Sequence, residues 1–224
     1  MDTKKQRVLL VPGNWIGKKL LTKLQTENPG LEVVLLIGLT LKQRVKKVKS
    51  LIMSNHYDAI IGYSSGCTVL AELERLNMIM WETKVLYCAP APQPSVRFKI
   101  SERMFGKVGK YLPQLLLKPL GRLLLSKYDF LSIFEGKKDV EVVENLEPES
   151  CWFMFGQIFG QLCSPKPLAD NPNRIIFRSV GDQLLGSTQN DTVKILRGAR
   201  EIFAITPGHY GVMLDLKYLL GLIK

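Results

Sequence analysis

The sequence predicts an α/β fold with a mostly parallel, doubly wound sheet that carries helices on both faces. Short apolar runs of strand length recur along the chain, and most of them end at Gly, Pro or a polar turn. Segments with apolar residues at helical spacing lie between these runs, an alternation typical of a parallel sheet. The strand-like runs are continuously apolar, as expected for strands buried on both faces. Hydrophobic residues make up 46% of the 224 residues and charged residues 23%, which allows a sizeable core.

Taken in order, each element has its own signal. The first strand ends at Pro12-Gly13, and Gly38 stops the second. Leu41, Val45 and Val48 recur at helical spacing with lysines among them, which predicts an amphipathic helix. The expected elements are strand 7–11, helix 18–24, strand 31–37, helix 41–52, strand 59–62, a helix to about residue 77, strand 84–88, helix 149–163, strand 174–178, helix 193–196, strand 201–205 and helix 210–223.

The alternation breaks after the strand at 84–88. A turn-rich segment with three prolines follows at 89–94, and from residue 96 to about 146 the sequence is rich in leucine, basic and interrupted by Pro and Gly. This composition predicts short helices rather than strands. We therefore expect a core formed by residues 1–90 and 147–224, with residues 91–146 as a helical insertion.

The most informative motif is Gly62-Tyr63-Ser64-Ser65-Gly66, which fits G-x-S-x-G between an apolar strand and a helix. A serine that attacks a carbonyl must stand exposed on a sharp strand-to-helix bend. That bend places Ser64 in a sparsely populated backbone region and brings neighbouring backbones too close for a Cβ at the two glycines. A Gly/Ser-rich turn without chemistry is the alternative interpretation.

Two further residues complete a possible catalytic triad. Asp182 follows the strand at 174–178, and His209 follows the last strand. Ligands bind at the carboxyl edge of open α/β sheets, so Ser64, Asp182 and His209 are expected at one edge. The histidine would act as the base and the aspartate would fix its tautomer. Asp170 and Asp139 are alternative acids, whereas His56 precedes the strand of Ser64 and is expected to be structural.

The chain resembles the α/β-hydrolase superfamily over nearly its whole length, through the elbow, the Gly-Asp turn and the Gly-His turn in this order. The resemblance implies an oxyanion hole formed by the backbone N–H groups of Ser65 and Asn14, although Pro12 stands where the family often has His. Trp15 and Tyr63 are candidate substrate-binding residues, and Trp15 could instead simply pack. The resemblance also identifies residues 91–146 as a cap over the active site.

The favoured function is that of a serine hydrolase acting on a small acyl ester or thioester through an acyl-enzyme, without a cofactor. A serine nucleophile argues against the dehalogenase and epoxide-hydrolase branches of the family, which use an aspartate there. Acyltransferase or lyase chemistry on the same triad, and a non-catalytic binding protein, remain alternatives. The two distant histidines and four scattered cysteines do not suggest a metal site.

Of the net charge of +11, the segment 97–127 within the predicted cap carries +7, because Glu102 is its single acid beside eight basic residues. A solvated surface is the simple interpretation, and an acidic acyl carrier protein or an anionic lipid surface is the functional one. Nucleic acid is disfavoured, because the basic residues are not interleaved with stacking aromatics. No segment resembles a signal peptide or is apolar enough to span a membrane, so we expect a cytoplasmic protein. The cysteines form no C-x-x-C pair and are expected to be reduced. The eight basic residues are Arg97, Lys99, Arg103, Lys107, Lys110, Lys118, Arg122 and Lys127.

Overall fold

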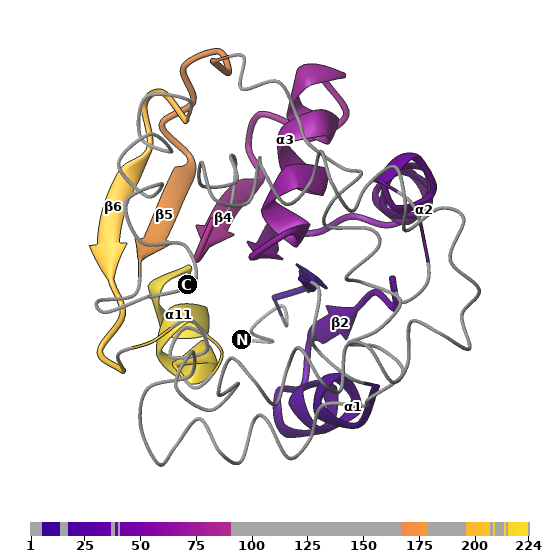
Figure 1. Cartoon of the computed structure of the whole chain (residues 1–224), viewed down its shortest axis with the longest axis vertical. Helices are drawn as coiled ribbons and strands as arrows, with labels where there is room; N and C mark the ends of the chain where they lie inside the picture. Colours follow the sequence, from indigo (N-terminus) through magenta and orange to yellow (C-terminus); the bar gives the residue numbers. More distant parts are fainter. Residues whose placement is uncertain are drawn as a thin grey trace, which may run out of the picture.

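The described part of the chain is organised around one parallel sheet (Figure 1). The computed structural model describes residues 6–13, 18–36, 39, 41–90, 167–178, 196–206, 208, 213 and 215–223. These residues form a six-stranded sheet in the order β2-β1-β3-β4-β5-β6, and every neighbouring pair is parallel. The elements are β1 (Val8–Val11), α1 (Lys18–Glu27), β2 (Leu31–Val33), α2 (Leu41–Ser54), β3 (Ala59–Tyr63), α3 (Gly66–Arg75), β4 (Lys84–Cys88), β5 (Arg174–Arg178), β6 (Arg200–Phe203) and α11 (Leu216–Leu222).

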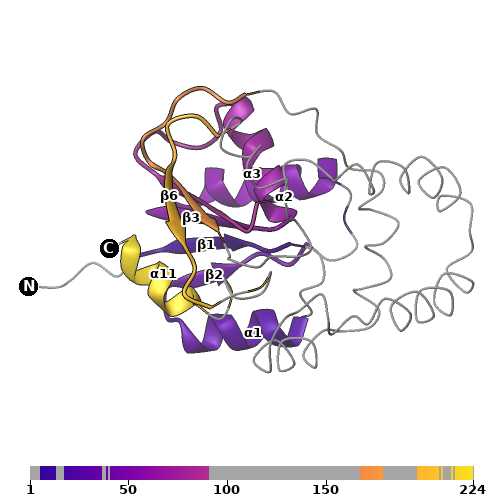
Figure 2. The ribbon, with the colours of Figure 1, turned by 60° about the vertical axis from the view of Figure 1, so that its left-hand side comes forward.

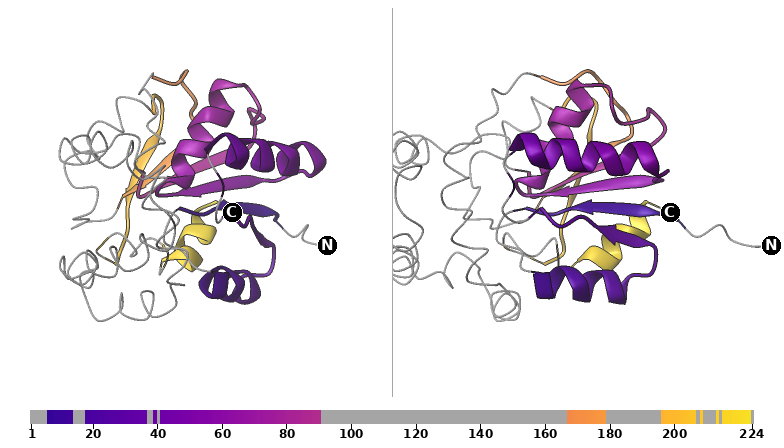
Figure 3. Two further views of the ribbon diagram at one scale, coloured as in Figure 1. Left: turned by 45° about the vertical axis from the view of Figure 1, so that its right-hand side comes forward. Right: turned by 90° about the vertical axis from the view of Figure 1, so that its right-hand side faces the viewer.

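Helices cover both faces of this sheet, which confirms the predicted doubly wound architecture. Figures 2 and 3 show α2 and α3 on one face and α1 and α11 on the other. The hydrophobic core divides accordingly. One cluster joins the sheet to Leu21 of α1 and Leu219 of α11, and the other joins it to Val48 of α2 and Leu70 of α3. The strands β1, β3 and β5 are buried along their full length, as their continuous apolar runs predict.

The register brings the carboxyl ends of the central strands to one edge. Val11 pairs with Gly62 between β1 and β3, and Tyr63 pairs with Cys88 between β3 and β4. The strand order reverses between β1 and β3, because β2 lies outside β1 while β4, β5 and β6 follow β3 on the other side. The connections after β1 and β3 therefore lead to helices on opposite faces of the sheet, α1 and α3, and such a reversal is where open α/β sheets bind ligands.

A buried polar cluster ties α3 to β4 and β5 away from that edge. The Arg174 Nε donates to both carboxylate oxygens of Glu74 at 3.0 Å, and these side chains are only 3% and 7% exposed. The Tyr87 hydroxyl also donates to Glu74, and Asn171 Nδ2 donates to it at 3.2 Å. The Arg174 Nη1 donates to the Arg197 carbonyl at 2.6 Å. Each buried charge thus has several polar partners, as stable burial requires.

Several predicted boundaries differ from the structure. The second strand ends at Val33 rather than at residue 37, although Val34 N still donates to Leu10 O at 3.1 Å and Val34 remains buried. Beyond this bond, the apolar character of the sequence reflects packing and not strand pairing, as at the buried Leu36. The last strand ends at Phe203 rather than at residue 205, and Ile205 is 72% exposed. Helix α11 spans Leu216–Leu222 and Met213 before it is also helical, while residues 210–212 and 214 of the predicted helix lie outside the described residues.

The predicted insertion at 91–146 and the predicted helix at 149–163 lie outside the described residues. The helix predicted at 193–196 lies outside them except for its last residue, Leu196, which is in a bend. In the part of the chain that the structure describes, no helix has the length and apolar character needed to cross a bilayer.

Candidate active site

Ser64 lies on the strained bend that the motif predicts. It directly follows β3, has φ = 52°, and precedes α3 by two residues. A left-handed backbone at a non-glycine residue is uncommon and costs on the order of 1–3 kcal/mol, so it persists only where the surroundings hold it. Ser64 is buried, at 8% exposure, rather than exposed as the motif predicts.

Two glycines allow the loop after β1 to reach the serine. A Cβ on Gly66 would lie 2.1 Å from the Val11 carbonyl oxygen, closer than any real contact, so α3 begins directly against the end of β1. A Cβ on Gly13 would lie 2.7 Å from the Ser64 Cβ and 3.3 Å from its Oγ. Gly13 therefore borders the nucleophile itself. The loops that leave β1 and β3 meet at the point where the strand order reverses.

Gly62, the first glycine of the motif, has a different neighbour. A Cβ there would lie 2.8 Å from Leu70 Cδ1 and 3.0 Å from the Cys67 Cα, both in α3. This glycine lets α3 pack closely on β3, while Gly66 lets it pack on β1. The predicted reason for the two glycines, a neighbouring backbone too close for a Cβ, is confirmed at Gly66, whereas at Gly62 the nearest atom belongs to the Leu70 side chain.

The start of α3 points its partial positive charge at this bend. Ser65 is the N-cap residue, and the first turn closes with Cys67 N donating to Ser64 O at 3.0 Å and Thr68 N donating to Ser65 O at 3.2 Å. A helix N-terminus favours developing negative charge near its first N–H groups. The predicted Ser65 donor is thus at a helix start beside Ser64. Asn14, the other predicted donor, lies outside the described residues.

The Cys67 thiol and the Cys88 carbonyl group lie next to the bend at Ser64. The Cys67 Sγ is 3.1 Å from Gly62 O and 3.4 Å from Cys88 O, and Cys88 O also accepts from Ser64 N at 2.9 Å. Burial raises the pKa of the Cys67 thiol far above its usual range, so the group stays protonated and serves as a donor. Cys67 and Cys88 are both free thiols. Sequence analysis missed this arrangement, since neither cysteine carries a spacing signal.

Asp182 and His209 lie outside the described residues, but the strands that precede them are described. Both β5 and β6 end at the same edge as β3, which agrees with the predicted direction of their loops. The loop of His209 is closed at its base by Asp215, whose carboxylate accepts from Thr206 N at 2.8 Å and from Thr206 Oγ1 at 2.7 Å. Gly208 within it is buried and has φ = 89°. Sequence analysis missed the Thr206–Asp215 pair.

The two predicted substrate-binding residues have different outcomes. Tyr63 is 0% exposed and belongs to the core cluster on the face of α1 and α11. The structure therefore gives Tyr63 a packing position, and its contact with a substrate stays a prediction. Trp15 lies outside the described residues.

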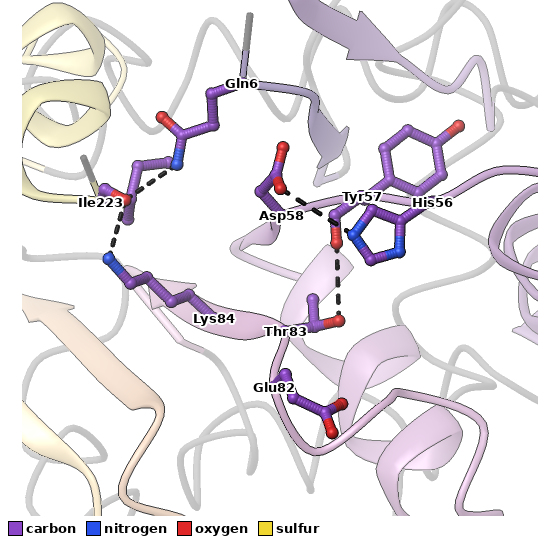
Figure 4. Close-up of a pocket in the computed structure, with 8 residues that line it drawn as sticks. All are labelled: Gln6, His56, Tyr57, Asp58, Glu82, Thr83, Lys84 and Ile223. Atoms are coloured by element: carbon purple, nitrogen blue, oxygen red, sulfur yellow. Dashed lines mark hydrogen bonds and ion pairs between the residues drawn. The ribbon is translucent and has the colours of Figure 1, made fainter. Parts of the chain in front are cut away.

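A surface pocket of about 460 Å³ lies at the opposite edge of the sheet (Figure 4). Its polar groups largely bind one another: Gln6 Nε2 and Lys84 Nζ both donate to Ile223 O at 2.8 Å, and Asp58 accepts from Arg7 N at 2.8 Å. The two bonds to Ile223 fasten the end of α11 to β4 and to the segment before β1, and the bond between Arg7 and Asp58 joins the segments before β1 and β3. His56 lines this pocket with its Nε2 3.9 Å from Asp58, so it is remote from Ser64, as predicted. Among the described residues no cluster of potential ligands could hold a metal ion.

Comparison with known proteins identifies the fold. No protein-family model matches the chain, and no curated protein matches it. Solved structures match closely in shape despite low identity. A thermophilic esterase from Thermogutta terrifontis has a TM-score of 0.66 at 13% identity, covering 97% of this chain and 88% of that one. A lipase-esterase related protein from Clostridium acetobutylicum has a TM-score of 0.63 at 15% identity, covering 99% and 94%.

Neighbours with other chemistry match equally well. A haloalkane dehalogenase from Agrobacterium tumefaciens has a TM-score of 0.63 at 13% identity, covering 98% of this chain and 89% of that one. The chain therefore has the α/β-hydrolase fold, as its elbow and turns predicted. A fold shared by esterases and a dehalogenase does not choose between reactions, so the reaction must be argued from the residues at the site.

Proposed function

We propose that this α/β-hydrolase-fold protein is a serine hydrolase that cleaves a carboxylic ester or thioester through an acyl-enzyme. The observation that carries the proposal is the backbone of Ser64, held at φ = 52° between β3 and α3 at the reversal of strand order. Strain of this kind persists at functional sites, where it presents a reactive group. A serine in this position supports acyl transfer through an oxygen nucleophile rather than the aspartate chemistry of the dehalogenase branch.

The reaction would run in two balanced steps. In the first, His209 removes the Ser64 proton as the oxygen attacks the acyl carbon, and the same proton then passes to the leaving alcohol or thiol. In the second, water attacks the acyl-enzyme with His209 again as the base, which releases the acid and restores Ser64. Asp182 would hold the imidazole in the productive tautomer. The Ser65 and Asn14 N–H groups would stabilise the oxyanion in each step.

A direct test is labelling by a fluorophosphonate probe, which forms a covalent bond only with an activated serine. We expect the wild-type protein to be labelled at Ser64 and Ser64→Ala to be neither labelled nor active on p-nitrophenyl butyrate. Ser50→Ala, which removes an exposed hydroxyl on α2, is the matched control and should behave as wild type. Labelling that survives in Ser64→Ala would refute the assignment. Absence of any labelling in the wild type would favour the non-catalytic alternative.

The remaining triad members have separate tests. Asp182→Asn should keep KM and lose most of kcat, because an amide does not hold His209 as a carboxylate does. His209→Ala should be as damaging as its combination with Ser64→Ala, since triad residues act as a unit. Unchanged activity of Asp182→Asn would move the acid role to Asp170 or Asp139.

The basic segment between positions 97 and 127 suggests how a substrate is delivered. An acidic acyl carrier protein would be steered toward seven net positive charges, and such steering is screened over about 8–10 Å at physiological salt. The kcat/KM for a carrier-linked ester should then fall steeply with added salt, while that for a neutral ester stays flat. Reversal of Arg103, Lys107 and Lys110 to Glu should mimic high salt. Equal salt dependence for both substrates would leave these charges as surface residues. This role, and reduced cysteines, fit a cytoplasmic location.

A further inference from the structure

The Cys67 thiol contacts β3, which ends at the nucleophile, and the neighbouring strand β4. It belongs to the first turn of α3, is 2% exposed, and lies 3.1 Å from the Gly62 carbonyl of β3 and 3.4 Å from the Cys88 carbonyl of β4. Both distances are within the range for a sulfur donor, so the thiol hydrogen can bond to either carbonyl oxygen. Among these contacts, the one to Cys88 matters most for Ser64.

The Cys88 carbonyl is the group that fixes the Ser64 backbone from the side of β4. Ser64 N donates to it at 2.9 Å, one residue beyond the last register pair of β3 and β4, Tyr63 with Cys88. This bond extends the hydrogen-bonding pattern between β3 and β4 by one residue, into the bend. One carbonyl oxygen thus receives the nucleophile's N–H and the thiol together. Its orientation decides where the Ser64 backbone lies.

Backbone strain is present on both sides of this bond. Ser64 has φ = 52°, and Ala89, which follows Cys88, has φ = 43° although it is not a glycine. Ala89 is fully buried and its N donates to Phe177 O at 2.9 Å. Two strained residues that directly follow neighbouring strands require surrounding contacts that over-determine their conformation. The hydrogen bond from Ser64 N to Cys88 O is one such contact, and the Cys67 thiol next to Cys88 O is another.

We propose that Cys67 is a positioning residue for the nucleophile, which acts through the Cys88 carbonyl to hold the Ser64 backbone in its strained conformation. This inference rests on the proposed function of Ser64. Cys67 does not itself react, because burial raises the pKa of its thiol and keeps it protonated. Its role is to donate, so a hydroxyl at the same position should preserve the effect and a methyl group should not.

The test compares Cys67→Ala, Cys67→Ser and Val69→Ala. Val69 is a fully buried residue of the same helix and the same core cluster, so its truncation removes packing without removing either thiol contact. In Cys67→Ala we expect kcat for p-nitrophenyl butyrate and the fluorophosphonate labelling rate to fall about 10-fold at unchanged KM, because a small displacement of a reacting group is costly. Cys67→Ser should recover most of the rate. Val69→Ala should retain kcat when measured on folded protein.

Amide hydrogen exchange gives a readout that does not depend on activity. Exchange at Ser64 N should become at least tenfold faster in Cys67→Ala, relative to Val85 N, whose bond to Asn173 O is elsewhere in the sheet. Unchanged kcat and unchanged Ser64 exchange in Cys67→Ala would overturn the positioning role, as would a Cys67→Ser variant as slow as Cys67→Ala. If wild-type Ser64 is not labelled, the proposed function fails, and the exchange experiment alone decides whether Cys67 fixes the bend.

Discussion

Replacement of Gly13 by alanine is the sharpest steric test of the site. The added Cβ would lie 2.7 Å from both the Ser64 Cβ and the Tyr63 carbonyl oxygen, about 0.7 Å inside the 3.4 Å at which ordinary contact begins. Gly13 is not among the glycines with positive φ, so its own backbone does not resist a side chain. The whole effect therefore comes from the collision with Ser64 and the end of β3.

The expected loss of stability and of activity depends on which atoms must move to make room for the new Cβ. The obstructing atoms are the Ser64 Cβ, whose position the strained backbone fixes, and the Tyr63 carbonyl oxygen. Neither is the end of a flexible side chain, so the loop or the nucleophile has to shift. Overpacking of this kind costs about 1–3 kcal/mol of stability. A shift of the nucleophile by a sizeable part of 1 Å should lower kcat/KM by about 10- to 100-fold. We expect activity to be lost well before the fold is.

Gly221→Ala is the matched control, because a Cβ at Gly221 in α11 would meet nothing within 4 Å. Alanine in place of glycine within a helix should raise stability by about 0.5–1 kcal/mol without changing activity. Urea denaturation followed by circular dichroism gives the free energies of unfolding, and p-nitrophenyl butyrate hydrolysis gives kcat/KM. Wild-type kcat/KM in Gly13→Ala would show that Gly13 does not border a working nucleophile and would refute the steric argument.

Two further predictions concern stability. Arg174→Met should destabilise the protein by about 3–5 kcal/mol in urea denaturation, because it leaves the buried Glu74 carboxylate without its cation. Adding Glu74→Gln to this variant should recover part of the lost stability. A loss below about 1 kcal/mol, as for a surface ion pair, would contradict this expectation. The second concerns alkaline pH, since burial raises the pKa of the Cys67 and Cys88 thiols in the folded protein. Thiols of the unfolded chain ionise near pH 8.5, so the folded state binds more protons above that pH and each thiol should remove about 1.4 kcal/mol of stability per pH unit. Unfolding free energies between pH 8 and 10 measure this slope, which Cys67→Ala should reduce; an unchanged slope would argue against a buried neutral thiol.

Local signals were sufficient to predict the sheet. The strands β4 and β5 have the predicted bounds, because each is a short apolar run between turn residues and is buried on both faces. The prediction for β2 was too long because Val34 and Leu36 are buried by packing beyond the end of the strand. An apolar run reports burial and does not report where hydrogen-bonded pairing stops.

The candidate site likewise combines a feature that the sequence predicts with contacts that it does not predict. The bend at Ser64 is specified within five consecutive residues, so the motif predicts it, and the structure confirms its positive φ. Contacts between residues apart in the sequence are not predicted: Cys67 reaches Cys88 at the bend, and Thr206 reaches Asp215 at the base of the His209 loop. Such pairs produce no periodicity and no fixed spacing. They become visible only when the strands have been placed side by side.

The fold assigns stability and proposed reactivity to different parts of the same helix. At its start, α3 is held by Gly66 against β1 and by the Cys67 thiol against β3 and β4, next to a serine in a conformation that costs on the order of 1–3 kcal/mol. At its end, Glu74 is bound to Arg174 on β5 in a nearly dry environment. A helix anchored only at the far end could relieve the strain by lifting its first turn. Anchoring both ends removes that freedom, so the strained bend remains the lowest accessible arrangement of the chain.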